Sequence, residues 1–200
     1  EAQIFSLLEE KGVSTVEQLE ETAANYDFKF SFLKGVVPLG DPKRLEGYLF
    51  PDTYDFYKGE EISSVVGKLV YNFQNKAESL MEDIQASGMT LDQVVTLASI
   101  IEKEAIGDDE ERANISSVFY NRLSGDNSEI GTALQSDATI YYALHIAGMD
   151  DTQFSTDLDS PYNTYLHTGL TPTPIANPGL ASLQAALNPE SHNYYYYVLN

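Results

Sequence analysis

Two glutamates, Glu102 and Glu104, close a strongly apolar stretch of the chain and are separated only by Lys103. A carboxyl group beside apolar surface loses hydration, and this desolvation raises its pKa. A carboxyl group that keeps its proton near neutral pH can act as a general acid. The pair is therefore a candidate for proton transfer. The alternative is a solvated helix end that is stabilised by local ion pairs with the lysine.

The element that positions these glutamates is an expected helix over residues 90–105. Thr90 and Gln93 have the spacing of a capping box, which marks a helix start. Helical spacing then gives the segment one apolar face, made of Leu91, Val94, Val95, Ala98 and Ile101. Glu102 projects into the middle of this face and Glu104 lies at its margin. Helical geometry alone does not choose between the two glutamates.

Composition limits the classes of function. The 200 residues include 31 acidic and 11 basic side chains, so the formal net charge is −20. Such a surface repels phosphate backbones and anionic lipids, which disfavours binding to nucleic acid or to a lipid surface. The chain has no cysteine and only three histidines, without H-x-x-x-H spacing. Thiolate sites are excluded and a histidine zinc site is disfavoured, so we expect neither a metal nor a cofactor.

An aromatic and acidic segment, residues 45–56, has no helical period. Gly47 and Pro51 break regular structure, so we expect an ordered loop with short extended pieces. Rings beside carboxylates suit sugar binding, which makes Glu46 and Tyr48 candidate binding residues. The alternative is a packed loop whose tyrosine hydroxyls satisfy buried groups.

Two further regions carry candidate polar side chains. In residues 134–138, Asp137 is expected to be the N-cap of a helix over 138–147, and the Gln135 amide could point into a cleft. Prolines stiffen the second region, residues 160–179, and such rigid irregular backbone usually positions something. Its candidates are Tyr162, Asn163 and Asn177.

The remaining pattern predicts an α+β fold that is mainly helical, with one small β-sheet. We expect further helices at about 4–12, 14–25, 62–84, 108–123 and 179–187. An aromatic run over 194–199 is expected to be the final strand. Residues 1–40 form an N-terminal helical segment in this interpretation, and residues 41–200 form the main domain.

Three long motifs resemble one family, the endolytic murein transglycosylases (MltG, or YceG-like, family). They are E-G-Y-L-F-P-D-T-Y at 46–54, A-S-I-I-E-K-E at 98–104, and Y-N-T-Y followed by G-L-x-P-x-P-I-x-N-P-G within 162–179. The resemblance implies a peptidoglycan lyase that cleaves MurNAc-β-1,4-GlcNAc bonds and leaves 1,6-anhydro-MurNAc ends. It implies Glu104 as the catalytic acid and Glu102 as a buried, hydrogen-bonded supporting residue. Leu166, Thr171 and Thr173 depart from the usual family pattern.

The resemblance also implies a cellular setting. The family acts on the extracytoplasmic face of the cell membrane, with an N-terminal anchor that this chain lacks and a LysM-like region before the catalytic part. Residues 1–40 would be the trailing edge of that preceding region, and the catalytic domain, 41–200, would continue beyond this chain. Implied partners are peptidoglycan strands and the penicillin-binding proteins of cell-wall synthesis.

The expected site places the other candidates around Glu104. Hydrogen bonds to the sugar or its N-acetyl group are expected from Gln135, Asp137, Tyr162, Asn163 and Asn177, with Glu46 and Tyr48 on the opposite wall. One alternative is a hydrolytic muramidase that uses Glu104 with Glu46 or Asp137 and leaves free reducing ends. The other is a non-catalytic glycan-binding module, which retains glycan without cleaving it.

Overall fold

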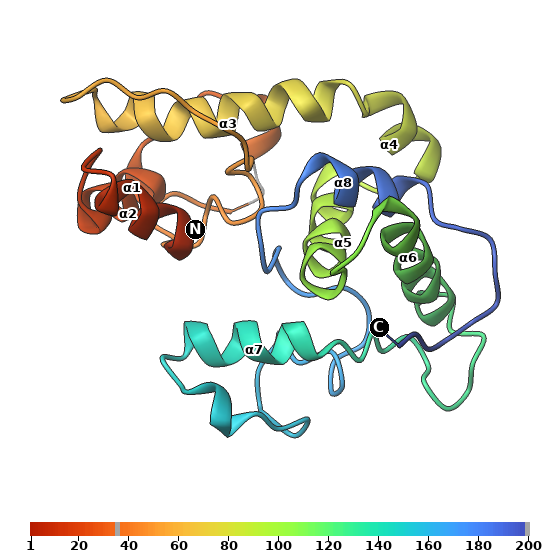
Figure 1. Ribbon diagram of the computed structural model, residues 1–200. Coiled ribbons are helices and arrows are strands. Elements are labelled where there is room, and N and C mark those ends of the chain that lie inside the picture. The colour runs from red at the N-terminus through yellow and green to blue at the C-terminus, as the bar shows by residue number, and fades with distance from the viewer. Residues whose placement is uncertain (35–36, 199–200) are drawn as a thin grey trace. The chain divides into compact units, whose positions relative to one another are not determined.

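The computed structural model describes residues 1–34 and 37–198, which form helices joined by turns and irregular segments (Figure 1). Contacts divide the chain into two units, residues 1–82 and 83–200. Buried apolar side chains occur in both, so each unit has its own core. The expected division at residue 40 stays a prediction.

The first unit is built on three helices. α1 (Ala2–Glu10) packs against α2 (Val16–Asn25), and α2 packs against the long α3 (Ile62–Glu78). A short 3₁₀ helix, η1 (Ser31–Leu33), lies between α2 and α3 in the sequence. In the segment before α3, every residue from Arg44 to Phe50 is buried, so this segment is a packed part of the core.

The expected helix over residues 62–84 is interrupted. α3 ends at Glu78, and a separate helix, α4, spans Met81–Ser87. The Ser79 hydroxyl donates to the Lys76 carbonyl at 2.6 Å, and the Ser79 amide donates to the same oxygen at 3.2 Å. Such local bonds compete with the helical hydrogen-bond ladder, which explains the break.

The second unit contains the expected pair of glutamates. α5 (Leu91–Glu104) packs against α6 (Asp109–Leu123) and α8 (Leu180–Leu187), and α6 also packs against α8 (Figure 1). α7 (Asp137–Ile146) contacts α5 and the 3₁₀ helix η2 (Asp151–Gln153). Every residue of α5 from Val94 to Ile101 is buried. This helix is therefore the centre of the unit and a rigid support for its last turn.

The predicted start of α5 is confirmed. The Gln93 amide donates to the Thr90 hydroxyl at 3.2 Å, and the Thr90 amide donates to the Gln93 side chain at 2.9 Å. The predicted cap of α7 is wrong by one residue. Ser136 occupies the N-cap and Asp137 is the first helical residue, which leaves the Asp137 carboxylate available to another partner.

The predicted α+β class is wrong. Among residues 1–34 and 37–198 there is no β-strand, and the nearest approach to one is an isolated parallel bridge between Ala133 and Gly169. The expected strand over 194–199 is absent from its described part, which ends at residue 198. Helix side chains bind its carbonyls instead: Asn121 donates to Tyr194 O and Arg122 donates to Tyr195 O, each at 2.8 Å. Leu199 lies outside the described residues.

Candidate active site

Glu104 is the last residue of α5. The helix ends there because Ala105 takes an extended backbone conformation. The half-buried Glu104 side chain accepts a hydrogen bond from the Ser136 hydroxyl at 2.5 Å between the two oxygens. Ser136 is buried at the N-cap of α7. The carboxylate therefore lies at the start of α7, where the positive end of a helix dipole favours negative charge.

The Ser136 hydroxyl does not make the hydrogen bond that an N-cap serine usually makes. A serine at an N-cap normally accepts a hydrogen bond from the first turn of its helix. No such bond forms at α7, and the hydroxyl donates to Glu104 instead. The Ser136 position is held by its own backbone amide, which donates to the Thr164 hydroxyl at 3.0 Å. Ser136, which contacts the candidate acid Glu104, thus lacks the usual N-cap hydrogen bond, and such departures from local preference are typical of functional sites.

A second hydroxyl reaches Glu104 from the C-terminal segment. Burial raises the pKa of the Tyr197 phenol well above its usual value, and the charge of Glu104 and a hydrogen bond to it raise that pKa further. Tyr197 therefore stays protonated and can donate to the carboxylate. Two donors from segments far apart in the sequence converge on one glutamate.

A buried cation lies beside these groups. Arg122, in the last turn of α6, is only 5% exposed. Its Nε donates to Tyr195 O, and its Nη1 donates to Leu134 O. Burial lowers the pKa of the guanidinium, while the nearby negative charge of Glu104 acts in the opposite direction. Arginine stays charged in proteins, so Glu104 has a permanent positive neighbour.

Asp137 is used in a second hydrogen bond at the site. Its carboxylate accepts from the Tyr165 hydroxyl at 2.7 Å. Burial raises the pKa of Tyr165, and the hydrogen bond and charge of Asp137 raise it further, with a smaller contribution from Glu104. Tyr165 therefore lies near both acids. The structure brings Glu104, Asp137 and Gln135 into one region, because Gln135 and Ser136 both bind Thr164 through their backbone amides.

Gln135 is the one non-glycine residue with positive φ among those described, at 51°. This left-handed conformation costs an ordinary residue about 1–2 kcal/mol. Its amide is held by Thr164 O at 3.1 Å. Strain of this kind is concentrated at functional sites, which makes the segment a site candidate on structural grounds as well.

This strain gives a stability prediction. We expect Gln135→Gly to be more stable than Gln135→Ala by about 1 kcal/mol, because glycine adopts positive φ without the steric penalty of a side chain. Thermal or urea unfolding of the two variants measures the difference. Equal stabilities, or a more stable alanine variant, would show that the conformation carries no strain.

Tyr162 and Asn163 organise the irregular segment before α8. Asn163 is fully buried, and its side-chain nitrogen donates to Thr156 O at 2.9 Å and Leu158 O at 2.8 Å. Its side-chain oxygen accepts from the Tyr165 amide at 3.0 Å, so Asn163 supports the residue that binds Asp137. The Tyr162 hydroxyl pairs with Thr173 at 2.7 Å.

Glu102 holds the start of α8. Its carboxylate accepts from the Gly179 amide at 3.2 Å and from the Ser182 hydroxyl at 2.6 Å. Ser99, one turn earlier on α5, accepts from the Ile175 amide at 2.9 Å. One face of α5 thus binds the proline-rich segment, which includes the half-buried Asn177.

The candidates of the first unit are buried there. Glu46 is 5% exposed and its carboxylate accepts from the amino group of Glu1 at 2.7 Å. Tyr48 is 1% exposed, and its ring lies edge-on to Phe73 and beside Phe32, with centroid distances of 5.1 and 5.7 Å. Both side chains are built into the core of residues 1–82.

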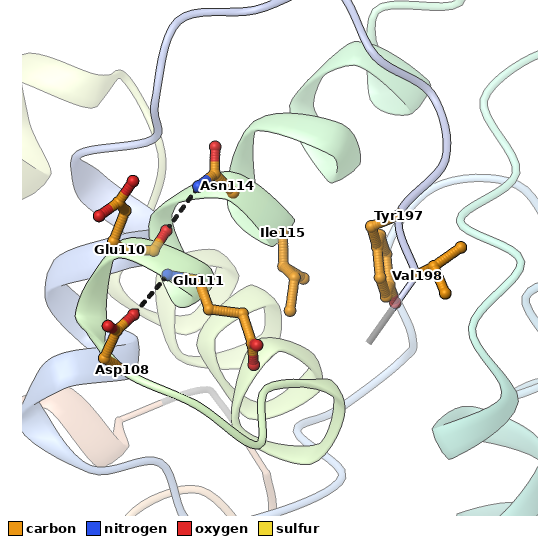
Figure 2. A pocket seen from close by; sticks show the side chains of 7 residues that line it. All are labelled: Asp108, Glu110, Glu111, Asn114, Ile115, Tyr197 and Val198. Atoms are coloured by element: carbon orange, nitrogen blue, oxygen red, sulfur yellow. Dashed lines mark hydrogen bonds between the residues drawn. The ribbon is translucent and has the colours of Figure 1, made fainter. Parts of the chain in front are cut away.

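A pocket of about 340 Å³ lies next to Tyr197 (Figure 2). Figure 2 shows Glu111 and Ile115 of α6 on one side and Tyr197 and Val198 on the other. This volume is at the lower end of the range for small-ligand pockets, about 300–1,000 Å³. Tyr197 belongs both to the lining of this pocket and to the surroundings of Glu104, and Glu104 itself is not part of the lining.

A larger cavity, of about 680 Å³, lies at the other end of α5. Its lining includes Asp92, Gln93 and Thr96 together with Tyr120 and Leu170. Glu104 is twelve residues beyond Asp92, which corresponds to about 18 Å along a helix.

Sequence reasoning did not select Arg122, Ser136, Tyr165 or Tyr197. A usable signal existed for Arg122, because Ile115, Val118, Phe119 and Arg122 follow the i, i+3, i+4, i+7 spacing of one helix face. An arginine at an otherwise apolar position is expected to be buried with partners. No comparable signal marks Ser136 or Tyr197, since their roles depend on contacts between distant segments.

Fold and site together define a helical protein with a glutamate at a helix end, supported by hydroxyl donors and a buried arginine. The model of the YceG-like family matches residues 2–200, and the chain belongs to this family. The resemblance inferred from the three motifs is therefore confirmed.

Known relatives agree with this assignment. The endolytic murein transglycosylase of Bacillus subtilis is 37% identical over 158 residues, which are 77% of this chain and 41% of the relative. That of Streptococcus pneumoniae is 34% identical over 160 residues, 78% of this chain and 28% of the relative. The chain thus spans less than half the length of these relatives.

A solved structure is also similar. The crystal structure of a YceG-like protein from Listeria monocytogenes superposes with a TM-score of 0.81 at 30% sequence identity. The match covers all of this chain and 67% of the Listeria chain. The helical architecture described above is therefore shared with a relative.

Proposed function

We propose that this chain carries the active site of a peptidoglycan lytic transglycosylase, with Glu104 as its acid and base. The proposal is supported by the convergence of Ser136 and Tyr197 on the Glu104 carboxylate, beside the Arg122 guanidinium. It is also supported by the names of the relatives from Bacillus and Streptococcus. The substrate bond is the MurNAc-β-1,4-GlcNAc linkage.

The reaction needs one side chain that both gives and takes a proton. Protonated Glu104 donates to the bridging oxygen, and the bond between that oxygen and C1 of MurNAc breaks. The 6-hydroxyl of the same MurNAc attacks C1, and the Glu104 carboxylate takes the hydroxyl proton. The new C1–O6 bond gives the 1,6-anhydro end, water is not consumed, and Glu104 is protonated again.

The surrounding groups support the charged state of this cycle. Glu104 becomes a carboxylate when its proton leaves, and the Ser136 hydroxyl, the Tyr197 hydroxyl and the Arg122 charge all stabilise an anion there. The nucleophile belongs to the substrate, so the site must orient the MurNAc ring. Gln135, Asp137, Tyr162 and Asn177 are the proposed sugar-binding residues, and Glu102 is a supporting residue. The sequence predicts sugar binding by Asn163 as well, but its buried side chain is occupied by three hydrogen bonds, so we propose it as a second supporting residue.

A hydrolytic muramidase is the second candidate, because Asp137 lies near the same tyrosine as Glu104 and could serve as a second carboxylate. Glycosidases with two carboxylates add water to C1. Asp137 is already bound by the Tyr165 hydroxyl at 2.7 Å, which favours a positioning role over activation of water.

The test is an analysis of the ends made from purified peptidoglycan. Digestion by this chain in ¹⁸O-labelled water is expected to give 1,6-anhydro-MurNAc ends without label, read by mass spectrometry. Labelled reducing ends would establish the hydrolase instead. If the glycan is bound but not cleaved, both enzymatic functions are excluded, and the chain is a non-catalytic glycan-binding module.

The cellular setting is part of the same proposal. Peptidoglycan lies outside the membrane, so the site would act on the extracytoplasmic face. Within the described residues, no helix combines the length and hydrophobicity that crossing a bilayer requires. An N-terminal membrane anchor and penicillin-binding partners are proposed from the family resemblance alone.

A further inference from the structure

Arg122 binds two separate segments with one side chain. Its Nε donates to Tyr195 O at 2.8 Å. Its Nη1 donates to Leu134 O and lies 3.5 Å from Gln135 O. The guanidinium is planar and its N–H donors point in fixed directions. The bond to Tyr195 O therefore fixes the direction of the bond to Leu134 O. The Tyr196 ring, with its centroid 5.5 Å from the guanidinium carbon, covers the same group.

Each bound carbonyl lies two residues before a hydroxyl that contacts Glu104. Leu134 precedes Ser136, and Tyr195 precedes Tyr197. The two segments are about sixty residues apart in the sequence, and within the described residues no β-ladder joins them. Their relative placement therefore depends on side chains, and Arg122 is bonded to both.

The neighbouring residue has a narrower role. Asn121 donates to His192 O at 2.9 Å and to Tyr194 O at 2.8 Å, so it holds only the C-terminal segment. A second arginine on the same helix, Arg112, donates to Gly107 O at 2.8 Å, and Gly107 belongs to neither segment. These residues provide comparisons for the function of Arg122.

We propose that Arg122 is a positioning residue: its guanidinium holds the 134–136 turn and the 195–197 segment in register, so that the Ser136 and Tyr197 hydroxyls both reach the Glu104 carboxylate. This inference rests on the proposed function. Arg122 acts through the Ser136 and Tyr197 hydroxyls and does not contact the reacting atoms. It accounts for a guanidinium that is buried at a cost in solvation.

The main test is Arg122→Lys. Lysine keeps the positive charge but has one nitrogen, which cannot replace the fixed donors of the guanidinium. Misplacing catalytic groups by about 1 Å can cost about 10²-fold in rate, so we expect kcat to fall by about that factor. KM should change less than kcat, because Tyr162 and Asn177 lie outside the two segments that Arg122 binds and only Gln135 lies within them. Arg112→Lys is the matched control and should keep native kcat.

A double-mutant cycle separates positioning from general stability. If Arg122 acts by placing the Tyr197 hydroxyl, then Tyr197→Phe should cost much less in the Arg122→Lys background than in the native chain. Independent, multiplicative losses would overturn the proposal. So would a native kcat in folded Arg122→Lys, or a change confined to KM.

Folding is checked for each variant by circular dichroism and thermal unfolding. If Arg122→Lys does not fold, Arg122→Gln, which keeps a planar group with two donors, replaces it. Failure of both variants to fold would assign Arg122 to stability and overturn the positioning role. The native chain and Glu104→Gln are run in the same digest. Absence of anhydro ends from the native chain contradicts the proposed function, whereas anhydro ends with unaffected Arg122 variants contradict only this inference.

Discussion

Glu104→Gln is expected to reduce the formation of anhydro ends by about 10³-fold or more, while the chain keeps its fold. General acid–base catalysis contributes about 10²–10⁴-fold, and here one group serves both steps. Glutamine has the same size, and its amide oxygen can still accept from Ser136 and Tyr197. The amide can neither release nor take the proton that the reaction moves. End analysis by mass spectrometry and a circular dichroism spectrum measure the two parts of this result.

Glu102→Gln is the informative comparison, because Glu102 lies in the same helical turn and faces a different partner. Its carboxylate binds the Gly179 amide and the Ser182 hydroxyl at the start of α8. Loss of this charge should cost about 0.3–1 kcal/mol of stability, the usual size of a helix-terminus interaction. Activity should fall far less than in Glu104→Gln. The reverse ranking of the two variants would exchange their roles. Glu129→Gln, at an exposed position, controls for the substitution itself.

The helices could be predicted because their signals are local. The Thr90–Gln93 capping box and the apolar period of α5 lie within one segment, and the structure has both. The start of α7 shows the limit of such signals. Ser136 and Asp137 are both good caps by residue type, and contacts with Glu104 and Tyr165 decide which bonds they make.

The expected sheet failed for a related reason. Four consecutive tyrosines and a valine, residues 194–198, favour a strand by residue type. Strand propensity reflects packing on a neighbouring pleated surface, and no described segment supplies one here. The carbonyls of His192, Tyr194 and Tyr195 are satisfied by Asn121 and Arg122. Residue type alone cannot distinguish a partner strand from a helix that offers polar side chains.

The candidate site was predictable in part. The family motif, and not helical geometry, selected Glu104 over Glu102. The groups that bind Glu104 come from residues 136 and 197, and only the folded chain brings them together. The roles of Ser136, Tyr197 and Arg122 follow from their hydrogen bonds, burial and charge in the folded chain. A sequence pattern gives little information about such contacts between distant segments.

The second large effect concerns the two hydroxyl donors. We expect Ser136→Ala and Tyr197→Phe each to lower kcat by about 10–100-fold. A hydrogen bond to a charged group is worth about 1.5–3 kcal/mol, and about 1.4 kcal/mol corresponds to tenfold in rate. The bonds act on the rate because the Glu104 carboxylate forms as its proton leaves, so the donors stabilise charge that develops in the transition state. Steady-state kinetics on glycan strands, with anhydro ends as the readout, give kcat and KM separately.

Matched controls make this prediction specific to the site. Ser128→Ala and Tyr194→Phe remove the same hydroxyls at exposed positions and should keep native rates. Both test variants keep most of the original side-chain volume, so the fold should be retained, which circular dichroism checks. If both variants keep native kcat, the two donors contribute nothing to the charged state of Glu104. If only KM rises, the hydroxyls bind the sugar in the ground state, and the carboxylate must then be stabilised by Arg122 and the start of α7 alone.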